Sequence, residues 1–212
     1  MATKLKVANA ALLKIGVSQT IVTFAEQTRE AYTVAELFDE SLREAQRSYP
    51  WAFATKYATL TLKSGSPTAP ANNDWIYAYI YPTDGLFIRR LVREGIGRLF
   101  DPSPPKYRIG RDYGNDSSSP DDDTLLVFAN EPNLQCEYTA EVKCSLNYAD
   151  AVFEDALSWL VASKLAPSLS RDAKMAEKCF AMYVRAFAFA SALSAQEQQQ
   201  EPEGEAEWIR DR

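Results

Sequence analysis

The chain contains no histidine, and this absence removes several classes of active site at once. Ser-His-Asp and Cys-His nucleophile pairs need an imidazole, and so do histidine-ligated zinc sites. Cysteine is scarce, because the chain holds only Cys136, Cys144 and Cys179 and no C-x-x-C pair. Cys136 and Cys144 fall in one predicted strand, roughly 26 Å apart at about 3.3 Å per residue, which is too far for a disulfide. We expect buried free thiols and neither a metal nor another cofactor.

Long apolar runs and excess positive charge are also missing. No apolar run reaches the roughly 18 to 20 residues that span a bilayer, and no apolar segment typical of a secretory signal stands near the first residue. The 212 residues carry 23 basic and 29 acidic side chains, for a net charge of −6. Tight binding of nucleic acid depends on Lys and Arg that neutralise phosphates, so it is disfavoured. We expect a soluble, intracellular protein without a membrane segment.

Helical periodicity appears at both ends of the chain. Asp150 is a good N-cap for a third helix, Pro167 marks its end, and Ser170 is expected to cap the fourth. The predicted helices cover about 3–15, about 28–49, the stretch from Asp150 to Pro167, and about 171–196.

Between these helical ends the apolar period changes from 3.6 to 2, which predicts strands. Leu134 to Cys144 alternates cleanly between apolar and polar residues and is typical of an antiparallel strand with one wet face. Five earlier stretches also favour strands: "KYATLTL", "WIYAYIY", "GLFIRRLV", "KYRIGR" and "TLLVFAN".

The order of these elements predicts an α+β protein. The short links within each helix pair suggest antiparallel hairpins, and we expect the two pairs to form an antiparallel four-helix bundle. An antiparallel β-sheet block is then inserted between helices 2 and 3, and an extended C-terminal tail follows the last helix. The expected parts are 1–51 (helices 1 and 2), 52–147 (β domain), 148–196 (helices 3 and 4) and 197–212 (C-terminal docking arm).

The fourth predicted helix is apolar on nearly all sides. Between Cys179 and Leu193 its only charge is Arg185. Such a helix must be buried nearly all round, whereas a small bundle covers about half of it. One interpretation places the uncovered half, with Phe180, Tyr183 and Phe187, against a second subunit. The other shields it within the chain, by the bundle and the β block.

The strand "WIYAYIY" places Trp75, Tyr77 and Tyr79 on one face. These rings are candidates for a subunit interface, because the opposite face is apolar too and the strand is expected to be covered on both sides. Stacking of sugars or bases is the alternative interpretation.

A cluster of arginines follows this strand in the sequence "RRLVREGIGR". In an acidic chain it predicts a local positive patch that could dock an acidic partner surface. A solvated strand-and-turn edge is the equally simple alternative. The members are Arg89, Arg90, Arg93 and Arg98.

The last stretch, "QEQQQEPEGEAEWIRDR", is rich in Gln and Glu, yet it carries Trp208 and Ile209 near its end. Its composition does not support independent folding. We interpret it as a docking arm in which Trp208 and Ile209 fill a pocket of another chain while Arg210 and Arg212 pair with carboxylates. The alternative is that Trp208 folds back on its own subunit.

Five stretches stand in an order that is informative. They are "NAALLKIG", "AYTVAELFDESLREAQRSYPWAFATKYATLTL", "WIYAYIYPTDGLFIRRL", "ALSWLVASKLAPSLSRDAKMAEKCFAMYVRAFAFASAL" and "EWIRDR". In this order they resemble the head-to-tail adaptor proteins of short-tailed bacteriophages, the tail tubular protein A family. In that family a helix ends in a "PW-x-FA" turn that leads into the first strand, and the chain closes with "W-I-x-x-R". The loops 64–74 and 112–123 match nothing in the family.

The resemblance implies a structural virion protein that is not an enzyme. Adaptors of this family form a ring, usually of twelve copies, that connects the capsid portal to the tail nozzle and forms part of the DNA channel. The partners implied are further copies of the chain, the portal and the nozzle protein, with no membrane. The implied location is the head–tail interface of the virion, with the host cytoplasm during assembly. DNA would pass without specific binding, which suits the negative net charge.

Two other functions stay open. One is a carbohydrate-active tail protein that degrades polysaccharide, with Tyr and Trp as a sugar platform and two carboxylates as acid and base. The other is a different neck or nozzle component of the same virion.

The docking interpretation of the arm generates a first prediction. Deletion of residues 202–212 should leave the fold intact and weaken attachment to the portal or to a neighbouring copy, because it removes the aromatic anchor and both arginines. Circular dichroism checks the fold, and co-sedimentation with assembled partners checks attachment. Unchanged assembly of the truncated chain would contradict the docking role.

Overall fold

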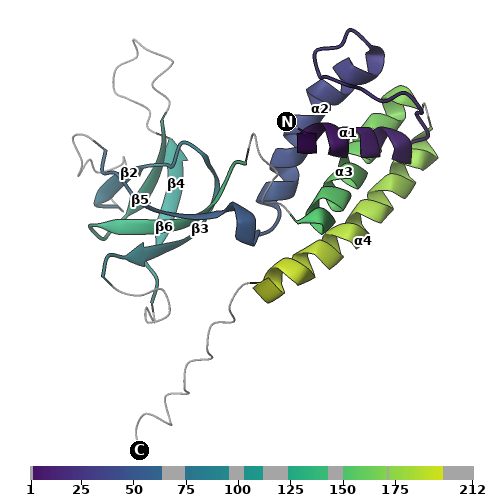
Figure 1. The fold of residues 1–212 in the computed structure, drawn as a ribbon. Coiled ribbons are helices and arrows are strands. Elements are labelled where there is room, and N and C mark those ends of the chain that lie inside the picture. The colour runs from purple at the N-terminus through teal and green to yellow at the C-terminus, as the bar shows by residue number, and fades with distance from the viewer. Residues whose placement is uncertain are drawn as a thin grey trace, which may run out of the picture. The chain divides into compact units, whose positions relative to one another are not determined.

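The computed structural model describes residues 2–63, 75–95, 103–111, 124–142, 150–170 and 172–197 (Figure 1). Strands lie between the second and third helices in the chain order. The helices are α1 (Ala2–Lys14), α2 (Arg29–Arg47), the short 3-10 helix η1 (Ala52–Ala54), α3 (Ala151–Leu169) and α4 (Ala173–Glu197). The strands are β1 (Thr55–Thr59), β2 (Tyr77–Ile80), β3 (Gly85–Arg93), β4 (Tyr107–Arg111), β5 (Leu125–Ala129) and β6 (Leu134–Ala140).

The chain divides into two compact units. Of the described residues, the helical unit combines those up to Thr55 with those from Thr139 to Glu197, and the β unit contains those from Lys56 to Tyr138. The predicted C-terminal arm, 197–212, lies outside the described residues except for Glu197, the last residue of α4.

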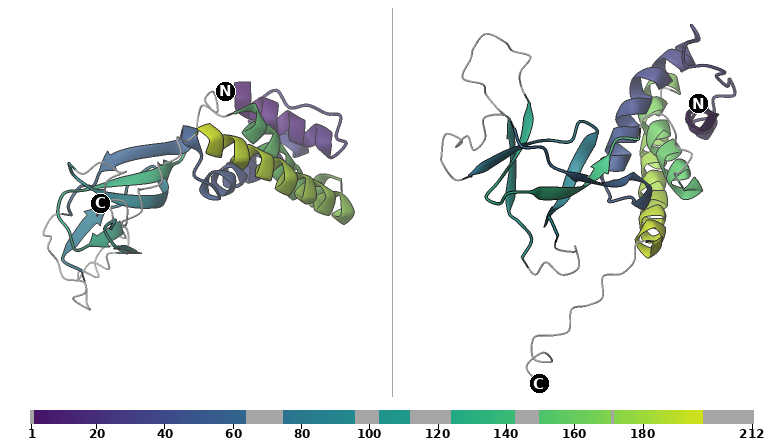
Figure 2. Two further views of the ribbon diagram at one scale, coloured as in Figure 1. Left: turned by 90° about the horizontal axis from the view of Figure 1, so that it is seen from below. Right: turned by 60° about the vertical axis from the view of Figure 1, so that its left-hand side comes forward.

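The helical unit is organised around α3, and the predicted antiparallel four-helix bundle is wrong. α3 packs against each of the other three helices. In Figure 1 α1 runs at an angle to α3 and α4, which lie side by side, and Figure 2 gives two further views of this arrangement. The reason lies in α3, whose buried residues point in all directions around its axis. A helix buried on all sides needs neighbours on all sides, whereas a bundle member needs only one buried stripe.

Local signals explain where the helices begin and end. The Thr28 hydroxyl accepts from the Ala31 amide at 3.2 Å and caps α2. Asp150 caps α3 as predicted, accepting from the Val152 amide. Capping of α4 by Ser170 is wrong, because Asp172 accepts from the Lys174 amide at 2.9 Å and the Ser170 hydroxyl donates to the Ala166 carbonyl. α3 also runs two residues past Pro167, so this proline lies in its last turn.

Lys14, the last residue of α1, contacts three residues of α3. Its ammonium lies 2.7 Å from the Asp155 carboxylate, donates to the Ser158 hydroxyl, and stands 4.1 Å from the centre of the Trp159 ring. Burial lowers the pKa of Lys14, and the ion pair with Asp155 acts against this shift. A partly buried lysine needs such a partner, because an unpaired charge away from water is costly.

Trp51 forms the centre of an aromatic cluster inside the helical unit. It is 1% exposed, and its indole N–H donates to the Ala45 carbonyl at 2.8 Å. Its ring packs edge-on against Phe153 of α3 and Phe187 of α4, with centroid distances of 4.8 and 5.5 Å. Trp51 lies between the end of α2 at Arg47 and the start of η1 at Ala52, so these contacts hold the segment after α2 against α3 and α4.

The β unit contains two separate three-stranded antiparallel sheets rather than the single block predicted. Their strand orders are β1-β6-β3 and β2-β5-β4. In the second sheet Tyr79 of β2 and Ile109 of β4 both stand opposite Val127 of β5. Residues just after β1 bond to both sheets: the Leu60 amide donates to Leu134 at 2.8 Å, and the Lys63 amide donates to Ala78 at 2.9 Å. The alternating pattern predicts strands but does not decide which strands pair.

Strand β6 also differs from its predicted wet-faced form. Glu137 is 8% exposed and Thr139 is fully buried, although the alternation places both on the wet face. β6 is the middle strand of its sheet, so neither of its edges is open. The Glu137 carboxylate lies 3.7 Å from Arg90 on β3, which provides a counter-charge for a buried acid.

A second prediction concerns Trp51. Trp51→Ala should lower the free energy of unfolding by about 3–5 kcal/mol, because it leaves a cavity beneath two other aromatic rings. Trp51→Phe should cost about 1–3 kcal/mol, because the buried Ala45 carbonyl loses its donor. Urea denaturation followed by circular dichroism measures both. Trp159→Phe, at a partly buried ring that carries the Lys14 contact, is the control with a smaller expected loss. Equal losses at Trp51 and Trp159 would contradict the central role of Trp51.

A third prediction concerns the thiols. Cys136 and Cys179 are free and buried, as expected, while Cys144 lies outside the described residues. Burial raises the pKa of Cys136 to about 11 and also raises the pKa of Cys179. At pH 8 roughly one Cys136 in a thousand is a thiolate, the reactive form. A Cys144→Ser variant should therefore resist a disulfide reagent at pH 8 when folded and react with two equivalents in urea. Rapid labelling of the folded variant would contradict this result.

Candidate functional site

The candidate site is an exposed apolar surface on α4, which we call the α4 outer face. Three large side chains dominate it: Phe180, Val184 and Phe189 are 51%, 51% and 61% exposed. Exposed alanines lie between them, and Arg185 is the one charged side chain among the residues from Phe180 to Phe189. The full set is Phe180, Ala181, Val184, Ala188, Phe189 and Ala192.

The opposite side of α4 is buried, and two of the predicted interface residues lie on it. Tyr183 is 9% exposed, and Phe187 packs against Trp51 and Tyr183 inside the helical unit. Of the three residues predicted on this helix, Phe180 alone therefore lies on the outer face. Sequence reasoning missed Val184 and Phe189, because a helix that is apolar on all sides does not reveal which side its neighbours cover.

The predicted aromatic face, with Trp75, Tyr77 and Tyr79, is partly or fully buried within the β unit. Tyr79 is 2% exposed, and its hydroxyl donates to a backbone carbonyl at 2.7 Å. Trp75 and Tyr77 are half-buried. On the other face Ala78 is buried but Ile76 is 51% exposed, so the described strand is covered on both sides only at its centre. An interface role for Trp75, Tyr77 and Tyr79 stays a prediction.

The arginine cluster is partly neutralised within the β unit. Arg93 forms a two-pronged ion pair with Glu131, at 2.5 and 2.7 Å, and Arg90 lies 3.7 Å from Glu137. The Arg89 guanidinium stands 4.6 Å from the centre of the Phe87 ring. Arg98 lies outside the described residues. These carboxylates reduce the positive potential that the sequence predicts, and docking of an acidic partner at this cluster stays a prediction.

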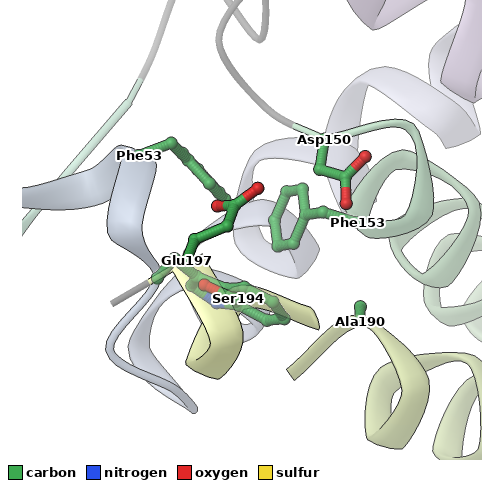
Figure 3. Close-up of a pocket in the computed structure, with 7 residues that line it drawn as sticks. Phe53, Asp150, Phe153, Ala190, Ser194 and Glu197 are labelled. Atoms are coloured by element: carbon green, nitrogen blue, oxygen red, sulfur yellow. The ribbon is translucent and has the colours of Figure 1, made fainter. Parts of the chain in front are cut away.

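A small cavity of about 200 Å³ lies at the end of α4 (Figure 3). In this view the Phe153 ring lies between the carboxylates of Asp150 and Glu197. Two of the polar groups already form hydrogen bonds with backbone amides. The Asp150 carboxylate caps α3, and the Ser194 hydroxyl accepts from the Ala52 amide at 3.2 Å. The lining residues are Trp51, Phe53, Asp150, Phe153, Ala190, Ser194 and Glu197.

The predicted anchor of the arm cannot be placed, since Trp208, Ile209, Arg210 and Arg212 lie outside the described residues. Among the helices that the structure describes, none is long and apolar enough to cross a bilayer. No model of a known protein family matches the chain, and no curated protein matches it. The resemblance to phage adaptor proteins therefore stays a prediction.

Proposed function

We propose that the chain is a structural subunit that assembles with further copies of itself, and that the α4 outer face forms part of the contact. The observation that carries this proposal is the exposure of Phe180, Val184 and Phe189 on one helix whose other side is buried. Single exposed apolar residues are ordinary, but several large ones on the exposed half of one helix favour an interaction site.

The size of this patch indicates how it is used. Complete burial of such a side chain contributes roughly 1.5–3 kcal/mol, so covering three half-exposed ones contributes only a few kcal/mol. Association costs about 4–15 kcal/mol in lost freedom of motion. The α4 outer face is therefore one portion of a larger contact, since a stable interface buries about 800 Å² on each partner. In a ring each copy is also held by two neighbours, so two such contacts act on it.

We propose further that the assembly is the adaptor ring that joins a capsid portal to a tail nozzle. The order of the sequence motifs supports this part of the proposal. The ring would hold about twelve copies, as the resemblance implies, and its other partners are the portal and nozzle proteins. The chain would be located at the head–tail interface of the virion. Its net charge of −6 suits a channel that DNA passes without adhering.

The cavity beside Trp51 gives little support to the alternative function, a carbohydrate-active tail protein. Ligand clefts usually enclose about 300–1,000 Å³, and this cavity is smaller at about 200 Å³. Its Asp150 carboxylate and Ser194 hydroxyl are engaged with backbone amides. A structural role for these groups is the simpler interpretation, and the ring is the function that we favour.

A fourth prediction tests self-assembly. Phe189→Ser should weaken association of the full chain about tenfold, because it removes roughly 1.4 kcal/mol of apolar burial from each contact. Native mass spectrometry and sedimentation velocity, alone and with the portal protein of the same virion, measure the assembled fraction. The free energy of unfolding should change by less than about 0.5 kcal/mol, since the side chain is exposed.

Leu13→Ser is the matched control. Leu13 lies on α1, in the same unit, and is 60% exposed against 61% for Phe189. It should assemble like the parent chain. Equal weakening by both substitutions, or a parent chain that stays monomeric with and without the portal, would contradict the proposal.

A further inference from the structure

The α4 outer face carries positive charge along one edge. Lys174, Lys178 and Arg185 are exposed and form no ion pair in the part of the chain that the structure describes. At 3.6 residues per turn they fall within about 40° of one another on the helix, on the side of Phe189. From 174 to 185 the helix holds these three bases and one acid, Glu177, which gives a net charge of 3 − 1 = +2.

This charge argues against contact between two α4 outer faces. The patch runs from Phe180 to Phe189, so a two-fold axis through its centre would place Arg185 beside Arg185 of the second copy. A parallel arrangement would place Lys178 beside its own equivalent. Like charges that face each other across an interface suppress association. The surface that receives α4 is therefore a different one, apolar in part and acidic.

A surface of this kind exists on α2, and we call it the α2 outer face. Tyr32 is 68% exposed there, and Glu36 forms no ion pair within the described ranges. From 30 to 40 the helix holds four acids and no base. Lys4 of α1 contacts Asp39 at 2.8 Å, and Lys164 of α3 contacts Glu40 at 3.7 Å. These two lysines compensate part of the negative charge of the α2 outer face. The face consists of Tyr32, Ala35, Glu36, Asp39 and Glu40, all exposed.

We propose that the α4 outer face of one copy docks on the α2 outer face of the next. This inference rests on the proposed self-assembly and identifies the two surfaces that meet. Lys174 and Lys178 are one helical turn apart, as are Glu36 and Glu40, and both pairs span about 6 Å. Tyr32 and Ala35 offer apolar cover for Phe189, the phenylalanine on the side of the basic residues. Because the two faces differ, each contact leaves a free α4 face and a free α2 face, so the contact repeats from copy to copy, as the subunits of a ring require.

A charge exchange in the full-length chain tests the pairing. The basic edge is reversed in Lys174→Glu with Lys178→Glu, and the acidic face is reversed in Glu36→Lys with Glu40→Lys. Each variant alone should assemble at least about tenfold more weakly than the parent, because every contact then joins like charges. An equimolar mixture should recover assembly, because each reversed face then meets its complement. Native mass spectrometry should show the two variants in equal numbers within each assembly.

The matched control is Lys106→Glu with Arg108→Glu, two exposed residues at the start of β4. It changes the net charge by the same amount as the α4 variant and should assemble like the parent. Circular dichroism checks every fold. Glu36→Lys alone replaces the double variant if the loss of the Lys164 contact with Glu40 unfolds the chain.

The outcomes separate the two proposals. Recovery in the mixture supports the pairing of α4 with α2. If the parent assembles but the mixture does not recover, or if each variant assembles like the parent, this pairing is wrong while self-assembly stands. If the parent does not assemble at any concentration, alone or with the portal, both are wrong.

Discussion

The helical unit depends on the need to cover α3 on every side. Most residues of α3 are buried around its whole circumference, so α1, α2 and α4 must each turn an apolar side toward it. Lys14, Trp51 and Phe153 hold this arrangement at particular points, through an ion pair with Asp155 and through edge-on ring contacts. A bundle that buries one stripe of each helix would leave apolar side chains of α3 exposed to water.

This constraint also decides what remains exposed. α4 directs Cys179, Tyr183 and Ala190 inward, which leaves Phe180, Val184 and Phe189 outside. α2 directs Val34, Phe38 and Leu42 inward and turns its carboxylates outward. Two chemically different surfaces result on one unit, one apolar with a basic edge and one mostly acidic. Such a pair is what a head-to-tail contact requires, since each copy must offer both partners.

The β unit shows how pairing decides the environment of single residues. Arg90 and Arg93 lie on β3, and the acids Glu137 and Glu131 lie on or just before β6, its neighbour in the sheet. Two members of a cluster that the sequence presents as a basic patch are thus in ion pairs within the unit. Likewise Tyr138 donates to Asp84, which Lys56 also contacts, so three distant segments share one polar network. Burial, with the hydrogen bond to Asp84, raises the pKa of Tyr138 to about 12.

The sequence by itself determined the local elements of this protein. Helical periodicity, the cap at Asp150 and the period-two stretches predict the four helices and the strands correctly, because these signals act over a few residues. The absence of histidine likewise excluded whole classes of catalysis. Only the tertiary structure decided that α3 rather than α4 is the central helix, that the strands form two sheets, and that Glu137 is buried beside Arg90. These outcomes depend on which distant segments meet, and apolar periodicity shows that a face is buried without showing what buries it.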